Sequence, residues 1–187
     1  MSELFSIQLQ NRQQQGRDGV WLDLPTTTEQ VQAALRQIGI SSDNPQGLFI
    51  SGYFAEEEKR FAIPYNMVLA SNVDELNFLA SRLETLSTGE RAELNAALQA
   101  PQSELFSIGR ITDFPENVDY YVHLPDVHGP AQLGDYYLNR SGMVDMPEEW
   151  KGGIDTAQFG RYVAQQEQGA FTQYGYLVKS GDEWQKV

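Results

Sequence analysis

The chain has 187 residues, 41% hydrophobic and 11% aromatic, which is enough to build folded cores and excludes a wholly disordered protein. Twenty-six acids against 13 bases give a formal net charge of -13, which disfavours direct binding to nucleic acid or to acidic membranes. The sequence has no cysteine, no N-terminal segment of signal-peptide type and no long apolar run, so we expect a cytoplasmic protein without disulfides, thiolate metal sites or membrane spans.

Residues 1–62 predict a small sheet with one helix. Alternating and aromatic apolar residues, bounded by turn signals, predict strands at 4–9, 20–24 and 48–54. Thr26 and Glu29 stand in capping-box spacing before a helical pattern that Gly39 ends. Trp21 lies on the second predicted strand, and we expect it in the core.

Residues 63–102 predict a helical part. Asn72 is a suitable N-cap for a helix with one apolar face, formed by Leu76, Leu79, Ala80, Leu83 and Leu86. Ser87 and Glu90 have the spacing of a second helix start, and Pro101 stops that helix.

Residues 103–187 return to a mixed pattern. Tyr120 to Leu124 predicts a strand, Pro130 or Ala131 opens a helix closed by Gly142, and Asp155 caps a further helix through Gln165. Phe171 to Lys179 predicts a strand, and a turn at 180–182 leads into a last strand ending at Val187. The fold class is therefore α+β, in three small domains at 1–62, 63–102 and 103–187.

The segment 113–149 concentrates the negative charge. It supplies seven of the 13 surplus negative charges, with Arg140 as its one base and eight acids: Asp113, Glu116, Asp119, Asp126, Asp135, Asp145, Glu148 and Glu149. Aromatic and apolar residues separate these acids, whereas a disordered acidic tail has few aromatics. The pattern indicates a folded negative surface.

Other chemistry is less well supported by the residues. His123 and His128, with Asp126 between them, have neither the spacing of a helical zinc pair nor that of a finger, so loop histidines are the preferred interpretation. An acid pair such as Glu148 and Glu149 would serve a hydrolase, but no nucleophile elbow or phosphate loop accompanies it. The tyrosine pairs at 120–121 and 136–137 predict core packing or a dimer seam.

Acids spread over a folded body suit the imitation of duplex DNA. B-DNA carries two phosphates per base pair, so 26 carboxylates match the phosphates of about 13 base pairs. Lysine and arginine of a DNA-binding protein would pair with carboxylates held at phosphate-like intervals.

Three segments resemble the ArdA antirestriction family of conjugative plasmids and transposons. The segment GVWLDLPTTTEQVQAAL is similar to the family's G-x-W-x-D/T-x-P and following helix, and VDELNFLASRLETLS resembles its I-x-E-L-N-x-L helix. The stretch AQLGDYYLNRSGMVDMPEEWKGGIDTAQFGRYV is similar to its D-V-A-R-Y-Y-I-E-E-T-G segment and the helix beyond. The antirestriction motif then falls near Gln132 to Pro147. The chain departs from the family in extra length at 99–118 and in Asn139-Arg140-Ser141, where the family often has acids.

The resemblance implies an elongated, curved homodimer that mimics bent B-form DNA and occupies the DNA-binding groove of Type I restriction-modification enzymes, in contact with their recognition and methyltransferase subunits. It implies no enzyme activity and no cofactor. The acids expected to bind the partner are those of 113–149, extended by Glu56, Glu57, Glu58, Asp74 and Glu75. An acidic adaptor for another basic protein, such as a nucleoid protein or a regulator, is the alternative, and a carboxylate-pair hydrolase the third.

Overall fold

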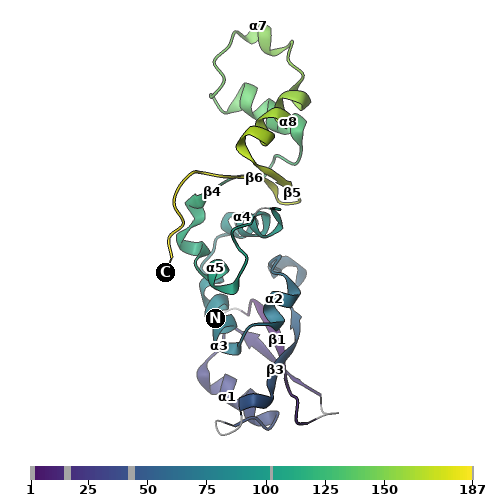
Figure 1. Ribbon diagram of the computed structural model, residues 1–187, viewed down its shortest axis with the longest axis vertical. Coiled ribbons are helices and arrows are strands. Elements are labelled where there is room, and N and C mark those ends of the chain that lie inside the picture. The colour runs from purple at the N-terminus through teal and green to yellow at the C-terminus, as the bar shows by residue number, and fades with distance from the viewer. Residues whose placement is uncertain (1–2, 15–17, 42–44, 102, 187) are drawn as a thin grey trace. The chain divides into compact units, whose positions relative to one another are not determined.

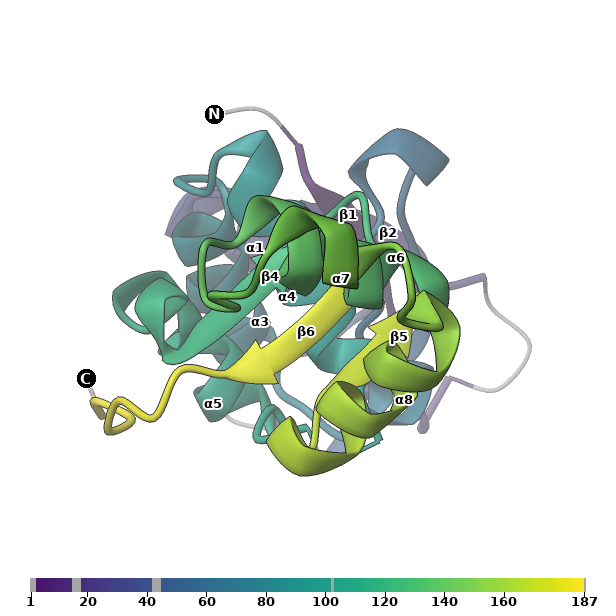
Figure 2. The same cartoon turned by 90° about the horizontal axis from the view of Figure 1, so that it is seen from above.

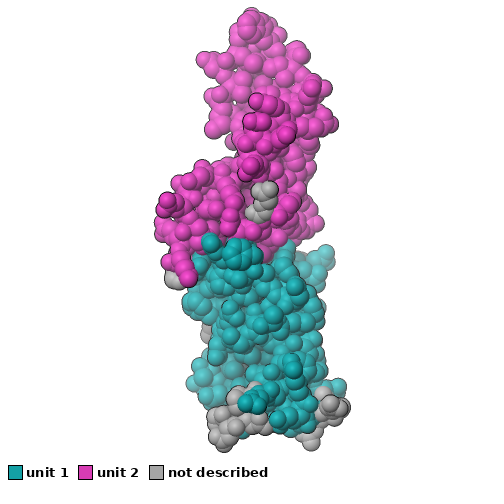
Figure 3. All heavy atoms as spheres, in the orientation of Figure 1, with its two compact units in different colours: residues 1–87, 105–115 teal, residues 88–104, 116–187 magenta. Residues whose placement is uncertain are grey.

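The computed structural model describes residues 3–14, 18–41, 45–101 and 103–186. They form two compact units: unit 1 comprises residues 1–87 and 105–115, and unit 2 comprises residues 88–104 and 116–187 (Figure 3). Each unit combines helices with a three-stranded antiparallel sheet, so the α+β class is confirmed (Figure 1). The division at 1–62, 63–102 and 103–187 stays a prediction.

The sheet of unit 1 contains the three strands that the sequence predicted. They are β1 (Phe5–Asn11), β2 (Val20–Leu24) and β3 (Leu48–Phe54), in the order β2-β1-β3. Along β1 the buried residues Phe5, Ile7 and Leu9 alternate with half-buried Ser6, Gln8 and Gln10. This period of two gives the sheet a core face and an outer face.

Trp21 does not lie in the core, so that prediction was wrong. In β2 the buried side chains are Leu22 and Leu24, and alternation therefore turns Trp21 to the outer face, where it is 49% exposed. Its ring lies across Gly52 of β3, since a Cβ at Gly52 would stand 3.0 Å from its Cη2 atom. A position on a strand suggested burial, but the alternation of that strand places Trp21 on the outer face.

Four α-helices are described in unit 1. They are α1 (Thr28–Gln37), α2 (Tyr65–Leu69), α3 (Val73–Leu83) and α5 (Ile108–Thr112), with single 3-10 turns at Pro45–Gly47 and Glu57–Lys59. A further 3-10 turn, Phe114–Glu116, ends at Glu116, which belongs to unit 2. α1 begins one residue later than predicted, because Thr27 is the N-cap and Gln30 completes its capping box in place of Thr26 and Glu29.

The N-cap predicted for α3 is confirmed. Asn72 Oδ1 accepts the backbone N–H of Glu75 at 2.9 Å. The predicted apolar face is buried, although Leu86 lies beyond the helix end rather than on it. Asn77 joins α3 to the chain after β2: its Oδ1 accepts Thr26 N–H at 2.7 Å and its Nδ2 donates to Thr26 O at 3.0 Å.

Unit 2 is built around the sheet β4-β6-β5. Its strands are β4 (Tyr121–Leu124), β5 (Ala170–Thr172) and β6 (Gly175–Lys179). Its helices are α4 (Thr88–Gln99), α6 (Pro130–Asp135) with a π-helical continuation at Tyr136–Arg140, α7 (Glu148–Lys151) and α8 (Thr156–Glu167), and a 3-10 turn spans Val118–Tyr120. A core of Val127, Leu133 and Tyr176 joins α6 and β6, and α8 lies beside β5 and β6 (Figures 1 and 2).

The backbones of α6 and α8 touch where both helices carry glycine. A Cβ on Gly160 would lie 1.8 Å from the Pro130 carbonyl oxygen, and one on Gly134 would lie 1.9 Å from the Thr156 carbonyl oxygen. No side chain fits at either position without separating the helices.

The C-terminal strands differ from the prediction. The strand expected at Phe171 to Lys179 is a hairpin, β5 and β6, whose turn ends at Gly175 with φ +117°. The last strand expected after 180–182 was wrong for residues 180–186, and Val187 lies outside the described residues. In this segment the backbone of Gln185 is bonded to a side chain instead of to a strand. Gln185 N–H donates to Asn117 Oδ1 at 2.7 Å, and Asn117 Nδ2 donates to Gln185 O at 2.8 Å.

Candidate functional site

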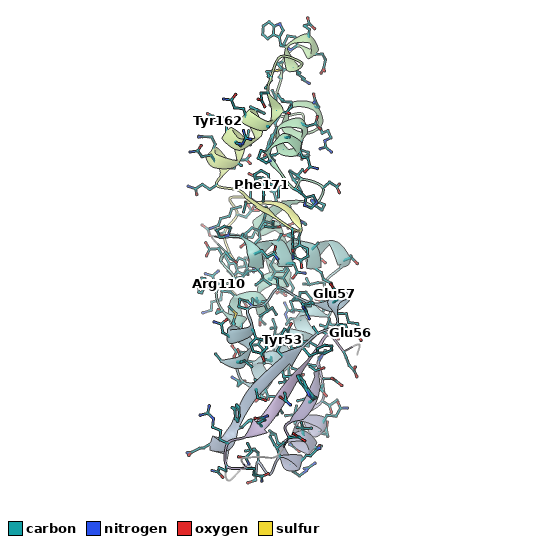
Figure 4. All side chains as sticks on the ribbon, turned by 90° about the vertical axis from the view of Figure 1, so that its right-hand side faces the viewer. Tyr53, Glu56, Glu57, Arg110, Tyr162 and Phe171 are labelled. Atoms are coloured by element: carbon teal, nitrogen blue, oxygen red, sulfur yellow. The ribbon has the colours of Figure 1, made fainter. Side chains whose placement is uncertain are left out.

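The first group of candidate acids follows β3. Glu56 and Glu57 are exposed at the start of a 3-10 turn and lie beyond the end of the strand (Figure 4). Glu56 Oε2 pairs with Lys59 Nζ at 3.1 Å, so part of its charge is compensated. The side chain of Glu58, also a candidate, lies outside those described.

The acids of the first turn of α3 are open to solvent. Asp74 and Glu75 are both exposed and follow the N-cap Asn72. Acidic side chains at a helix N-terminus interact favourably with the helix dipole, so these carboxylates also stabilise α3. Asp113, at the end of α5, is half-buried.

In unit 2 the acids from 116 to 126 occupy turns around β4. Glu116, Asp119 and Asp126 are exposed: the first two lie in the 3-10 turns before the strand and the third in the loop after it. Turns at the surface leave such side chains open to solvent.

The last group spans α6 to α7. Asp135 is half-buried. Its Oδ1 accepts a hydrogen bond from Asn139 Nδ2 at 2.8 Å, and its Oδ2 forms an ion pair with Arg140 Nε at 3.4 Å. Glu148 pairs with Lys151 at 2.6 Å. The remaining candidates of this group, Asp145 and Glu149, are exposed.

The candidates therefore form a dispersed anionic surface on both units. Of the twelve whose side chains are described, Asp113 and Asp135 are half-buried, and the exposed ones are Glu56, Glu57, Asp74, Glu75, Glu116, Asp119, Asp126, Asp145, Glu148 and Glu149. Unit 1 has 12 acids against 7 bases and unit 2 has 14 against 6, so their net charges are -5 and -8. An exposed array of this kind suits pairing with many cations of a partner rather than acid-base catalysis at one point.

Sequence reasoning missed the acid with the most perturbed environment. Glu93 of α4 is half-buried, and burial, with Glu90 and Asp119 nearby, raises its pKa to about 8. Its Oε1 atom has no hydrogen-bond partner among the described residues. Its position four residues before the buried Ala97 was a signal that it faces inward.

A second unpredicted carboxylate joins three elements of unit 2. Glu167, the last residue of α8, accepts a hydrogen bond from the Tyr137 hydroxyl through Oε1 and from the Tyr176 hydroxyl through Oε2 at 3.0 Å. Burial and the same carboxylate raise the pKa of both phenols, which remain protonated donors.

The predicted tyrosine pairs at 120–121 and 136–137 lie partly in the core. Tyr121 is buried, and Tyr120, Tyr136 and Tyr137 are half-buried.

The two histidines have separate surroundings. The ring of His123 donates through Nε2 to the Tyr174 carbonyl oxygen at 2.7 Å, whereas His128 is exposed and its backbone N–H donates to Gln132 Oε1 at 2.7 Å. Within residues 3–14, 18–41, 45–101 and 103–186, no three His, Asp or Glu side chains are grouped to hold a metal ion.

Unit 2 also contains a hollow of about 420 Å³ between the ends of α4 and α8 and the edge strand β5. Tyr121, Phe171 and Leu177 form its apolar walls, and Lys179 at its rim pairs with Glu104 at 2.6 Å. The dispersed candidate acids do not line it.

Comparison with known proteins gives one family. The family profile described as "Antirestriction protein (ArdA)" matches residues 15–178, which is most of the chain. A search of curated proteins returned no match. In the part of the chain that the structure describes, no helix is both long and apolar enough to cross a membrane.

Proposed function

Because this chain belongs to the ArdA family of antirestriction proteins, we propose that it mimics B-form DNA and occupies the DNA-binding groove of Type I restriction-modification enzymes. The family gives it an antirestriction function in general, and the mode of action and the enzyme type are the proposal. The protein acts without turnover or cofactor, in the cytoplasm and as a homodimer, and protects incoming mobile DNA.

The observation that carries the proposal is the exposure of the acids on both units. Ten of the twelve described candidate side chains are exposed, and each unit has a net negative charge. A duplex presents its phosphates in the same manner, as many separate charges over an extended surface. Lysine and arginine of a DNA-binding groove pair with carboxylates as they do with phosphates.

Distributed binding predicts small effects of single changes. Each exposed ion pair contributes about 0.2 to 1 kcal/mol, so no single acid is essential. Salt screens all of these pairs, and binding therefore weakens as ionic strength rises.

The test is a competition assay. A purified Type I methyltransferase bound to labelled duplex is titrated with the protein at low and at high salt. We expect displacement near one dimer per enzyme, weaker at high salt. A folded protein that displaces no DNA at any ratio refutes the proposal.

A matched pair of variants tests the candidate acids. Asp126→Asn with Glu149→Gln removes two exposed candidates of unit 2, and Asp182→Asn with Glu183→Gln removes two exposed acids of the same unit that are not candidates. Net charge changes equally in both. We expect the first variant to displace DNA about two- to tenfold less well at low salt and the second to be closer to the wild type. Abolition of activity by a single Ala substitution in a folded protein would refute distributed binding.

A further inference from the structure

The outer face of the unit 1 sheet carries exposed aromatic side chains. Strand register places Asp23, Ser6 and Phe54 in one row across β2, β1 and β3, and Trp21, Gln8 and Gly52 in the next. Phe54 is 55% exposed and Trp21 is 49% exposed. Both rings therefore offer apolar surface to a partner on a face that also carries the carboxylate of Asp23.

A hollow of about 240 Å³ lies at the Phe54 end of this face. We call it the Phe54 hollow, and its lining includes Glu3, Ser6, Asp23, Phe54, Glu56 and Lys59. Three carboxylates therefore face one ammonium group, which is already engaged with Glu56 at 3.1 Å.

The carboxylates retain acceptor capacity. Asp23 Oδ1 accepts a hydrogen bond from Ser6 Oγ at 2.5 Å, and a carboxylate has lone pairs for further donors. Glu56 meets Lys59 through Oε2. The hollow thus combines negative charge, free acceptor positions and one aromatic ring.

We propose that the Phe54 hollow receives an arginine side chain of the protein that this chain inhibits. The proposal rests on the DNA-mimic function, because the arginines that bind phosphate in a DNA groove are the cations that such a mimic meets. A guanidinium stacks on an aromatic face and donates to carboxylates in its own plane, and it is more weakly hydrated than an ammonium. Charge complementarity selects this occupant, and the acidic rim repels a nucleic acid or an anionic lipid.

Stacking gives this contact a property that phosphate mimicry lacks. Ion pairs at the surface weaken with salt, whereas apolar contact of a ring with a guanidinium plane is screened much less. The Phe54 hollow therefore supplies a part of the affinity that persists at high salt and that DNA does not share.

Phe54 variants test this in the methyltransferase competition assay. Phe78 of α3 provides the control, because it is the same residue type in the same unit and is 58% exposed. We expect Phe54→Ala to weaken displacement about two- to fivefold, by a similar factor at low and high salt, and Phe78→Ala to have no effect. Phe54→Tyr keeps the ring and should retain affinity, and Phe54→Leu should lose it as Ala does.

The outcomes separate the two proposals. If the wild type displaces no DNA, the DNA-mimic function fails. If the wild type displaces DNA but Phe54→Ala equals Phe78→Ala, or Phe54→Leu is fully active, the arginine site is refuted while the DNA-mimic function stands.

A second measurement identifies the cation without the enzyme. Blocked arginine and blocked lysine are titrated separately into the protein and followed by NMR. We expect the amide signals of Asp23 and Phe54 to shift more with arginine than with lysine, and this preference to be lost in Asp23→Asn but kept in Asp18→Asn. Equal shifts with both probes, or shifts spread evenly over the acids of the surface, overturn the assignment.

Discussion

Replacement of Gly160 by alanine tests the contact between α6 and α8. The added Cβ would lie 1.8 Å from the Pro130 carbonyl oxygen and 2.8 Å from Gly134 N, both backbone atoms that no side-chain rotation moves. Observed Cβ atoms essentially never approach closer than 3.0 Å, so the helices must separate by at least 1.2 Å near this point.

The cost follows from two opposing effects. Inserting a methyl group into a packed contact costs about 1 to 3 kcal/mol. We take about 3 kcal/mol here, because the atoms in the way belong to the backbone and cannot rotate aside. Alanine stabilises a helix by about 1 kcal/mol relative to glycine. We therefore expect Gly160→Ala to lower the free energy of unfolding of unit 2 by about 2 kcal/mol.

Urea denaturation followed by tryptophan fluorescence measures this change. Trp150 and Trp184 lie in unit 2, so a Trp21→Phe background confines the signal to that unit. Gly89→Ala in α4 is the control, since a Cβ at Gly89 meets no atom within 4 Å and should leave stability unchanged or slightly raised. If Gly160→Ala is as stable as Gly89→Ala, the close contact of the two helices is disproved.

Two further predictions concern stability. Burial raises the pKa of Glu93 from its ordinary value of 4.5 to about 8, so the folded state holds a proton that the unfolded state releases. Stability should therefore fall as pH rises from about 4.5 to about 8. Glu93→Gln should remove this fall in stability. At pH 9 it should be more stable than the wild type by about 1 to 2 kcal/mol, after discounting for partial exposure. Thermal melts from pH 4 to pH 9 measure this, and the same dependence of stability on pH in the variant and the wild type would contradict the assignment. Asn77→Ala removes two hydrogen bonds to Thr26 and should lower the free energy of unfolding of unit 1 by about 2 kcal/mol, whereas the exposed Ser81→Ala in the same helix should cost much less in the same urea titration.

The elements that the sequence predicted best have a local cause. β1, β2 and β3 follow from alternation bounded by turns, and α3 follows from an asparagine cap and a repeated apolar face. These signals each lie within about ten residues, so the sequence pattern alone reports them.

Elements that depend on distant partners were missed. α5 has five residues, too few for a helical period to be seen, and it is stabilised by packing against α3. The sequence predicts one strand where the structure has the hairpin of β5 and β6. The turn at Gln173 and Tyr174 lacks the Asn-Gly or Asp-Gly pair that usually marks a two-residue hairpin turn. The C-terminal segment is fixed by Asn117, nearly seventy residues earlier, and no local pattern reports that contact.

The candidate acids were located by composition, and their exposure follows from charge. The ion pairs at a separation of three, such as Glu148 with Lys151, can be predicted from spacing. The pair of Asp135 with Arg140, five residues apart, cannot, because it depends on the π-helical turn. The Phe54 hollow cannot be predicted either, because Asp23, Phe54 and Glu56 meet only through the register of the sheet.

The course of the chain through its two units has a consequence for synthesis and for truncation. The polypeptide passes from one unit to the other at 87/88, 104/105 and 115/116. Phe114 and Ile111, both fully buried in unit 1, are therefore translated after all of α4. Unit 1 cannot complete its core on the ribosome until residue 115 has emerged. A fragment ending at residue 87 would leave exposed to water the surface of α3 on which α5 packs. A stable N-terminal fragment must therefore extend to about residue 115, and it would include α4, which belongs to unit 2.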